Sequence, residues 1–283
     1  MIWRIAARAL AVVVTFAGGA VGLPASTQAT TTITSQTARN ALEAVSARRV
    51  LADTVRVKLL GRGVPRDAHL RAAVEAVAAV PRHLLVPPKF ASQAYVGTIL
   101  LIGYGQTSTD PEYVAYMTAL LRLKRTDRVL EVGTGSGYQA AVLASIVADV
   151  RTIEIVAPLA ASASANLESL GYANVHVRAG DGYAGWPEYG PFDAIMVTAG
   201  AKCLPPALIA QLRPGGRMAI PLGQSIASEK LVIISKLADG SIDANAYDDT
   251  MFVDFTGRIE RSTPLMRFRR GGIDLKNLRI CDA

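Results

Sequence analysis

The chain has 283 residues, 51% of them hydrophobic and 19% charged, with a formal net charge of +7. This is the composition of a packed globular protein, so a chain too polar to bury a core is excluded. Only two cysteines occur, Cys203 and Cys281, which excludes a framework of several disulfides and a C-x-x-C metal pair. One bridge between them is compatible with an oxidising compartment, but their spacing does not establish it.

The first 29 residues have the pattern of a secretory signal peptide. Arg4 and Arg8 precede an apolar stretch over 9–17, and glycine, proline and small residues follow. A membrane-spanning helix is disfavoured because the apolar stretch is short and lacks a basic flank on its far side. We therefore expect a signal peptide over 1–29, a Thr/Ser-rich linker over 30–36 and an exported protein, periplasmic or secreted, with no stable membrane span in its mature form. A cytoplasmic protein is the alternative.

Two helices and a long irregular segment are predicted next. Apolar residues at helical spacing indicate helices over 38–60 and 67–79. From 80 to 108, repeated prolines and glycines favour irregular chain. Loops of this length inside a compact domain are uncommon unless they are functional, so we interpret this segment as a lid or a substrate surface.

From residue 112 onward helices and strands alternate, and the strands are almost continuously apolar. This pattern predicts an α/β fold: a doubly wound, largely parallel, Rossmann-like sheet with N-terminal helices before it and an antiparallel addition at its C-terminal end. We expect this domain to span 37–257. The predicted elements are helices 112–123, 138–147, 158–169 and 205–212 and strands 128–132, 151–155, 175–178, 192–197, 217–221, 231–236 and 250–255.

The last residues, 258–283, form a basic C-terminal tail. Such a tail can contact nucleic acid, but no nucleic-acid motif accompanies it, and a solvated basic end is favoured. We therefore expect no nucleic-acid partner, and no metal site is predicted anywhere in the chain.

The run Gly133-Thr134-Gly135-Ser136-Gly137, directly after strand 128–132, carries the most information about function. A strand that opens into a glycine loop and then a helix presents bare backbone to a charged cofactor. The dinucleotide fingerprint G-x-G-x-x-G would need glycine where this chain has Tyr138. The G-x-G-x-G spacing therefore favours S-adenosylmethionine over a nicotinamide cofactor, and we assign all five residues of the run to cofactor binding.

Two later positions extend this predicted cofactor site. Glu154 follows the glycine loop by about twenty residues, at the tip of the neighbouring strand, where a carboxylate accepts hydrogen bonds from ribose hydroxyls. Asp181 and Gly182 follow the third strand of the series. We expect Asp181 to accept a hydrogen bond from the adenine amino group and Gly182 to let the base approach the backbone, although an ordinary Asp-Gly turn is the alternative.

Six short segments have a distinctive composition and order. They are Val80–Pro87, Gly103–Thr107, Glu131–Ala141, Gly180–Pro187, Pro191–Ile195 and Leu212–Arg217. Together they resemble the protein-L-isoaspartate O-methyltransferase family over roughly residues 45 to 257. The glycine loop occurs in many methyltransferases, whereas the Gly-Gln-Thr and Gly-Asp-Gly segments are close to diagnostic.

The resemblance implies methyl transfer from S-adenosylmethionine to the free carboxylate of an L-isoaspartyl residue in a damaged protein or peptide, by an enzyme expected to be a monomer. The ester then closes to a succinimide, which hydrolyses partly to normal aspartate. A carboxylate is already ionised at neutral pH, so no general base is required, and the site has mainly to position groups and exclude water. The resemblance puts the acceptor residues at Gln106, Thr107 and Thr109.

The acceptor segment departs from the family pattern at Thr109 and Asp110. Thr109 stands in the place of the family's serine, and it keeps a hydroxyl while adding a methyl group. A carboxylate at Asp110 would repel a carboxylate substrate, unless Asp110-Pro111 is a helix cap with proline in the first turn. Two alternatives therefore stay open: a methyltransferase with another acceptor, and an exported binding protein with little activity.

Four other residues have weaker signals. His83 has no motif-spaced partner and is interpreted as structural. Tyr183 and Trp186 are expected in the core or at its rim rather than against adenine. Thr198, at the tip of strand 192–197, is a candidate substrate contact because ligands bind at such tips.

Overall fold

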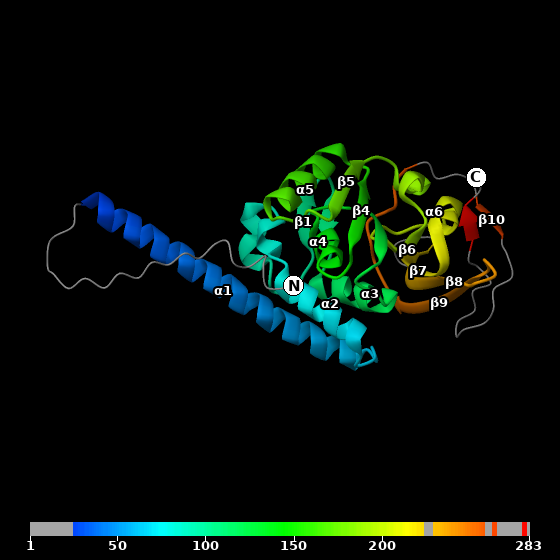
Figure 1. Cartoon of the computed structure of the whole chain (residues 1–283), viewed down its shortest axis with the longest axis horizontal. Helices are drawn as coiled ribbons and strands as arrows, with labels where there is room; N and C mark the ends of the chain where they lie inside the picture. The colour runs from blue at the N-terminus through cyan, green and yellow to red at the C-terminus, as the bar shows by residue number, and fades with distance from the viewer. Residues whose placement is uncertain (1–24, 224–228, 258–261, 265–278, 282–283) are drawn as a thin grey trace. The chain divides into compact units, whose positions relative to one another are not determined.

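The protein is described here by a computed structural model, shown in Figure 1. The chain divides into two compact units, Met1–Ala47 and Arg48–Ala283. Within the described ranges, no helix has both the length and the apolar character needed to cross a bilayer. The ranges that the structure describes are 25–223, 229–257, 262–264 and 279–281.

The described residues of the first unit belong to the long helix α1 (Ala25–Gly61), which continues into the second unit. The helix predicted over 38–60 is therefore confirmed, but it begins earlier. Residues 30–36, predicted as a linker, are helical, because Thr, Ser and Gln lower helix stability only slightly and no glycine or proline interrupts them. Residues 1–24, most of the predicted signal peptide, lie outside the described residues.

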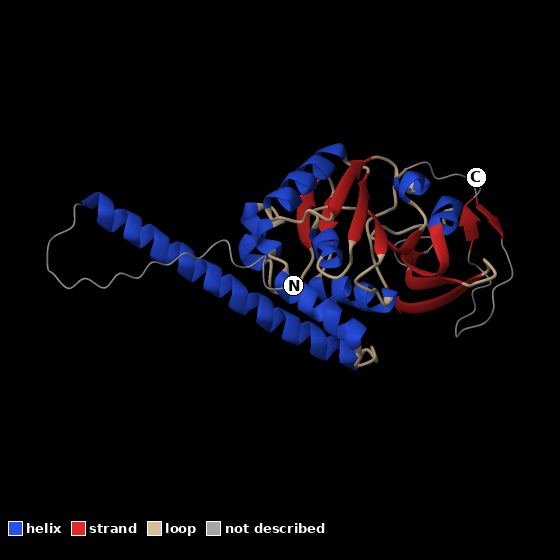
Figure 2. Ribbon diagram, viewed as in Figure 1, coloured by secondary structure: helices blue, strands red, loops and turns tan. Residues whose placement is uncertain are grey.

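A seven-stranded sheet organises the second unit, in the order β5-β4-β3-β6-β7-β8-β9. Its strands are drawn in red in Figure 2. Neighbours from β5 to β7 are parallel, and β8 and β9 are antiparallel additions. The chain order reverses between β3 and β6, which makes their carboxyl ends the expected ligand crevice. The strands are β3 (Arg128–Val132), β4 (Asp149–Glu154), β5 (Val175–Ala179), β6 (Phe192–Val197), β7 (Leu212–Leu222), β8 (Lys230–Lys236) and β9 (Ile242–Asp249).

Apolar side chains are buried on both faces of this sheet. Val129 and Met196 belong to a core that includes residues of α2, α3 and α4, whereas Leu130 and Ile195 belong to a core that includes α6. Continuously apolar strands need this double cover, and the predicted doubly wound fold is confirmed. The helices are α2 (Ala68–Ala79), α3 (Pro111–Leu121), α4 (Tyr138–Ala144), α5 (Ala157–Ser169) and α6 (Pro206–Gln211).

The C-terminal part of the sheet corrects one prediction. The strand predicted over 250–255 is wrong, because the last strand of the sheet is β9, and irregular chain follows it. Sequence reading misses β9 because it is an edge strand with many polar residues, and its second half is not buried. β7 also begins at Leu212, five residues before the predicted 217.

Residues 80–108, predicted as irregular, contain regular elements. The 3-10 helices η2 (Arg82–Leu84) and η3 (Pro88–Gln93) precede a hairpin of β1 (Leu100–Gly103) and β2 (Gln106–Ser108). The hairpin turns through Gly103, Tyr104 and Gly105, with φ of 96°, 53° and 73°. Glycine adopts positive φ readily and tyrosine rarely, which explains the two glycines around Tyr104.

Part of the predicted basic tail is folded. β10 (Ser262–Pro264) and β11 (Arg279–Cys281) pair antiparallel, and β11 also bridges to the chain at Leu204. Cys203 and Cys281 form a disulfide with their Cα atoms 5.1 Å apart, so the pairing that the sequence left open is made. This bond ties the end of the chain to the segment that follows β6.

Candidate active site

A cavity that is open to solvent lies at the carboxyl ends of β3, β4 and β6. We call Gly133–Ser136, Glu154 and Thr198 its glycine-loop wall, and Gln106–Thr109 its hairpin wall. Of the residues predicted to form the site, the cavity brings together Gln106, Thr107, Thr109, Gly133, Thr134, Gly135, Ser136, Glu154 and Gly182.

The glycine-loop wall is held by hydrogen bonds between strand tips. Gly133 N donates to Ile153 O at 2.8 Å, and the Thr198 hydroxyl donates to Gly133 O at 2.6 Å. Gly133 has a φ of 101°, and a Cβ atom there would collide with the Thr198 hydroxyl. Only glycine fits this position, and its backbone borders the cavity. Thr198, a modest candidate from sequence, is therefore both a wall residue and a support of the loop.

Glu154 lies at the tip of β4 with only 5% of its surface exposed. Its carboxylate accepts hydrogen bonds from Gly135 N at 2.8 Å and from Val156 N at 2.9 Å. Each carboxylate oxygen has a second lone pair, so Glu154 can also accept hydrogen bonds from two ribose hydroxyls. The bare glycine backbone and this carboxylate fit an adenosine cofactor such as S-adenosylmethionine.

Glu131 is a buried carboxyl behind the glycine-loop wall that the sequence prediction did not assign. It is fully buried near the end of β3, and burial raises its pKa to about 8. The Thr152 hydroxyl donates to Glu131 Oε2 at 2.5 Å, and the hydroxyls of Thr152 and Thr134 are 2.6 Å apart. This chain of polar groups links the interiors of β3 and β4 to the cavity at Thr134. The sequence signal for this buried carboxyl is an acidic residue between the apolar residues Leu130 and Val132 of the predicted strand.

Two residues predicted to bind the cofactor lie outside the cavity lining. Gly137, with a φ of 85°, is the N-cap of α4 and packs against Leu167. Asp181 accepts a hydrogen bond from Tyr183 N at 2.9 Å, within the turn that precedes the 3-10 helix η4 (Gly182–Ala184). Asp181 therefore makes the hydrogen bond of an Asp-Gly turn and lies outside the cavity lining, its contact with the adenine amino group stays a prediction, and its neighbour Gly182 lines the cavity.

The hairpin wall ends at the start of α3. Asp110 is the N-cap of this helix: its Oδ1 accepts a hydrogen bond from Glu112 N at 2.7 Å, and Pro111 takes the first helical position. Asp110 does not line the cavity, and burial raises its pKa. Of the two interpretations of Asp110, the structure confirms the helix cap. Thr109, the residue before it, lines the cavity.

Arg82 supports the hairpin wall from behind, and the sequence prediction did not assign it. Its side chain is completely buried. One guanidinium nitrogen, Nη2, donates to the carbonyl oxygens of Thr98, Ser108 and Thr109 at 2.9, 3.2 and 3.1 Å. The other, Nη1, donates to Ala94 O at 3.1 Å. Its place in the Val80–Pro87 segment was the available sequence signal.

The remaining candidates are structural. His83 Nδ1 and the Tyr95 hydroxyl are 2.5 Å apart, outside the cavity lining, and burial lowers the pKa of His83. Tyr183 and Trp186 pack against the core around α6, as expected. Among the described residues, no group of three or more His, Cys, Asp or Glu could hold a metal ion.

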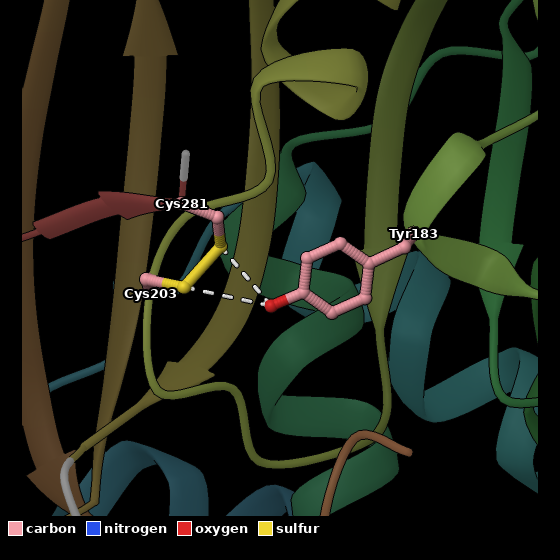
Figure 3. The surroundings of a disulfide bond; sticks show 3 residues. All are labelled: Tyr183, Cys203 and Cys281. Atoms are coloured by element: carbon pink, nitrogen blue, oxygen red, sulfur yellow. Dashed lines mark hydrogen bonds between the residues drawn. A yellow bond between two sulfur atoms is a disulfide. The ribbon is translucent and has the colours of Figure 1, made fainter. Parts of the chain in front are cut away.

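Tyr183 connects the disulfide to the neighbourhood of the cavity. Figure 3 shows the Tyr183 hydroxyl directed at the disulfide. The hydroxyl oxygen lies 3.0 Å from Cys281 Sγ and 3.5 Å from Cys203 Sγ. The Tyr183 ring packs on Phe255, with 4.7 Å between the ring centroids, and Phe255 lines the cavity. The disulfide therefore belongs to the support of the 253–256 segment.

Comparison with known proteins gives the family. The model of the protein-L-isoaspartate(D-aspartate) O-methyltransferase family matches residues 58–260. Over 193 residues the chain is 51% identical to protein-L-isoaspartate O-methyltransferase 1 of Nitrosospira multiformis, covering 68% of this chain and 80% of that protein. It is 50% identical over 193 residues to the protein-L-isoaspartate O-methyltransferase of Opitutus terrae, covering 68% and 82%.

Solved structures agree with this match. A protein-L-isoaspartate O-methyltransferase structure aligns with a TM-score of 0.63 and 28% identity, over 73% of this chain and 66% of that one. A structure from Plasmodium falciparum, in complex with S-adenosyl-L-homocysteine, aligns with a TM-score of 0.63 and 24% identity, over 74% and 98%, which shows the shared fold alone. The matched range contains both walls of the cavity, and the chain belongs to the protein-L-isoaspartate(D-aspartate) O-methyltransferase family.

Proposed function

We propose that this protein transfers the methyl group of S-adenosylmethionine to the free carboxylate of L-isoaspartyl residues in damaged proteins or peptides. The observation that carries the proposal is the single cavity in which a glycine loop with Glu154 faces the hydroxyl-rich hairpin wall. The relatives at about 50% identity, named protein-L-isoaspartate O-methyltransferases, support the same substrate. The activity repairs protein damage.

The glycine-loop wall holds the cofactor, which supplies the methyl group. Glu154 accepts the ribose hydroxyls, and the backbone of Gly133 and Gly135 lies against the cofactor. Thr134 and Ser136 supply hydroxyls on the same wall, and Gly182 borders it from the third strand. Gly137 acts indirectly, by capping α4, whereas Asp181 caps η4 and keeps further lone pairs that accept a hydrogen bond from the adenine amino group.

The hairpin wall holds the acceptor. Gln106, Thr107 and Thr109 offer an amide and two hydroxyls as donors to a carboxylate. An isoaspartyl carboxylate is ionised at neutral pH, so these residues orient it and exclude water without removing a proton. Because Asp110 is engaged as the cap of α3 and lies outside the cavity lining, it does not occupy the acceptor position.

A matched pair of peptides tests this proposal against its alternatives. Purified protein is incubated with methyl-labelled S-adenosylmethionine and two peptides that differ only in an isoaspartyl or aspartyl linkage. We expect base-labile methyl ester on the isoaspartyl peptide alone. Equal labelling of both peptides favours a different acceptor. Labelling of neither, together with no binding of S-adenosylhomocysteine in calorimetry, contradicts both enzyme functions and favours a binding protein.

We further propose that the protein is exported and that its mature chain begins after the signal-like segment. The disulfide between Cys203 and Cys281 supports this, because disulfides persist in oxidising compartments. Mass spectrometry of the native N-terminus tests it. A chain that keeps Met1, or thiol labelling that finds both cysteines reduced in the native protein, contradicts export. A monomeric state and the lack of a nucleic-acid partner stay predictions for light scattering and filter binding.

A further inference from the structure

The cavity has an unusual charge balance for a site that binds a carboxylate. Of the described residues that line it, none is Lys, Arg or His, whereas Glu154 and Asp254 are acidic. A further carboxylate brought into such a cavity is repelled by both. The sulfonium of the cofactor carries one positive charge, and any positive charge that the described residues of the protein add lies behind the wall.

Arg82 is that charge. It is completely buried, and every hydrogen bond of its guanidinium goes to a neutral group: four backbone carbonyls and, at 3.4 Å, the Ser108 hydroxyl. An arginine stays protonated in proteins, and burying a charge without an ionic partner is costly. The carbonyl dipoles reduce that cost, and none of these hydrogen bonds of the guanidinium beside the hairpin wall goes to a carboxylate.

The contacts of Arg82 also join the two walls. On one side it holds the carbonyls of Ser108 and Thr109. On the other, its guanidinium carbon lies 5.2 Å from the ring centroid of Tyr138, which follows the glycine run and lines the cavity. The Ser136 hydroxyl donates to the Ser108 hydroxyl at 3.4 Å beside it. Moving Arg82 therefore moves the hairpin wall relative to the glycine loop.

We propose that Arg82 is a positioning residue for the acceptor, and that its buried charge makes the hairpin wall prefer a carboxylate over a neutral amide. The proposal rests on the isoaspartyl methylation proposed above. It assigns specificity to a residue that does not touch the substrate. Asp110 lies close enough to interact electrostatically with Arg82, so its carboxylate weakens this preference.

The test compares two ligands in variants of the full chain. One is an isoaspartyl peptide, and the other is the same peptide with that carboxylate as a primary amide. Affinities are measured by calorimetry with S-adenosylhomocysteine present, and the readout is the ratio of the two dissociation constants. In Arg82→Met we expect the preference for the carboxylate to fall about tenfold or more, the effect of one nearby unit charge at an effective dielectric near 20.

Two further variants distinguish charge from packing. Arg82→Lys keeps the positive charge but loses the planar guanidinium with its several donors. We therefore expect this variant to keep more of the preference for the carboxylate peptide than Arg82→Met. Asp110→Asn leaves Arg82 untouched and keeps a good helix cap, and we expect it to raise the preference severalfold. This variant tests the proposal even if Arg82→Met does not fold.

The outcomes separate this proposal from the proposed function. If wild-type protein methylates the isoaspartyl peptide but Arg82→Met lowers the affinity for both peptides by the same factor, Arg82 is merely structural and the proposal is overturned. An Asp110→Asn ratio equal to or below that of wild type overturns it as well. If wild-type protein methylates no isoaspartyl peptide, the proposed function itself fails, whatever the variants do.

Discussion

The two walls of the cavity are built in different ways. The residues of the glycine-loop wall lie at the carboxyl ends of β3, β4 and β6, so the register of the parallel sheet positions them. Several hydrogen bonds also hold this wall in place. The hairpin wall lies on a separate two-stranded sheet and depends largely on one side chain, Arg82. The difference teaches that cofactor binding and acceptor recognition rest largely on different supports, although Arg82 and Ser108 also contact the glycine-loop side at Tyr138 and Ser136.

The largest change in ligand affinity is expected when Glu154 is replaced, and it should concern cofactor binding alone. Glu154→Ala removes the acceptor of the ribose hydroxyls and of Gly135 N. Hydrogen bonds to charged groups contribute about 1.5–3 kcal/mol each, so we expect the dissociation constant of S-adenosylhomocysteine to rise about a hundredfold or more. Calorimetry measures this, with Glu188→Ala as control, because the Glu188 side chain is 66% exposed. A similar loss in the control contradicts the prediction.

A pH-dependent effect is expected at Glu131, behind the same wall. The pKa of Glu131 is about 8 in the folded chain against its ordinary value of 4.5, so between these pH values the folded chain keeps a proton that the unfolded chain releases. Stability is therefore lost as pH rises from about 4.5 to 8, and is then constant. Glu131→Gln removes this loss.

Thermal melting at pH 5 and pH 8, without cofactor, checks the Glu131 prediction. The melting temperature of Glu131→Gln, relative to wild type, should increase between the two pH values. A difference that stays constant, or that falls with pH, means that Glu131 is ionised in the folded protein.

The disulfide is expected to affect the stability of the fold and not the binding of the cofactor. The bonded cysteines are 78 residues apart, and bridges of this kind contribute about 2–4 kcal/mol. We expect the double variant Cys203→Ser/Cys281→Ser to lose that amount in urea unfolding, and reduced wild-type protein to match it. The affinity for S-adenosylhomocysteine should change less than about threefold. A larger change would mean that the glycine-loop wall depends on the end of the chain.

The smallest change is expected when Thr109 is replaced, and it should concern methylation of the acceptor peptide and not cofactor binding. Thr109→Val keeps the shape and removes the hydroxyl, and we expect kcat/KM for an isoaspartyl peptide to fall about tenfold, the cost of one hydrogen bond to a charged group. Thr109→Ser, which restores the family's residue, should stay close to wild type. If either variant changes cofactor affinity by the same factor as peptide methylation, the two walls are not separable.

The glycine-loop wall could be predicted from the sequence because its signals are local. A buried strand, a glycine loop and a carboxylate at the next strand tip stand at fixed spacings, and parallel strands bring them to one edge. The strands β3, β4 and β6 were predicted from a signal of the same local kind, short segments with apolar residues that alternate with helical segments along the chain.

The hairpin wall and the end of the chain could be predicted only in part. Gln106 and Thr109 were found through a family resemblance, but their support is Arg82, more than twenty residues away, and nothing in spacing or periodicity links them. β9 is too polar to read as a strand. The bond between Cys203 and Cys281 depends on a contact across 78 residues of the sequence, which no local pattern encodes.

The disulfide also changes what a protease can do to this protein. Backbone and bridge together close a covalent ring from Cys203 to Cys281, and the ring includes β7, β8, β9 and the cavity segment 253–256. One cut at any peptide bond within that ring adds a water molecule but releases no fragment. The nicked protein therefore runs as two pieces only after reduction, and segment 253–256 stays attached to the cavity that it lines.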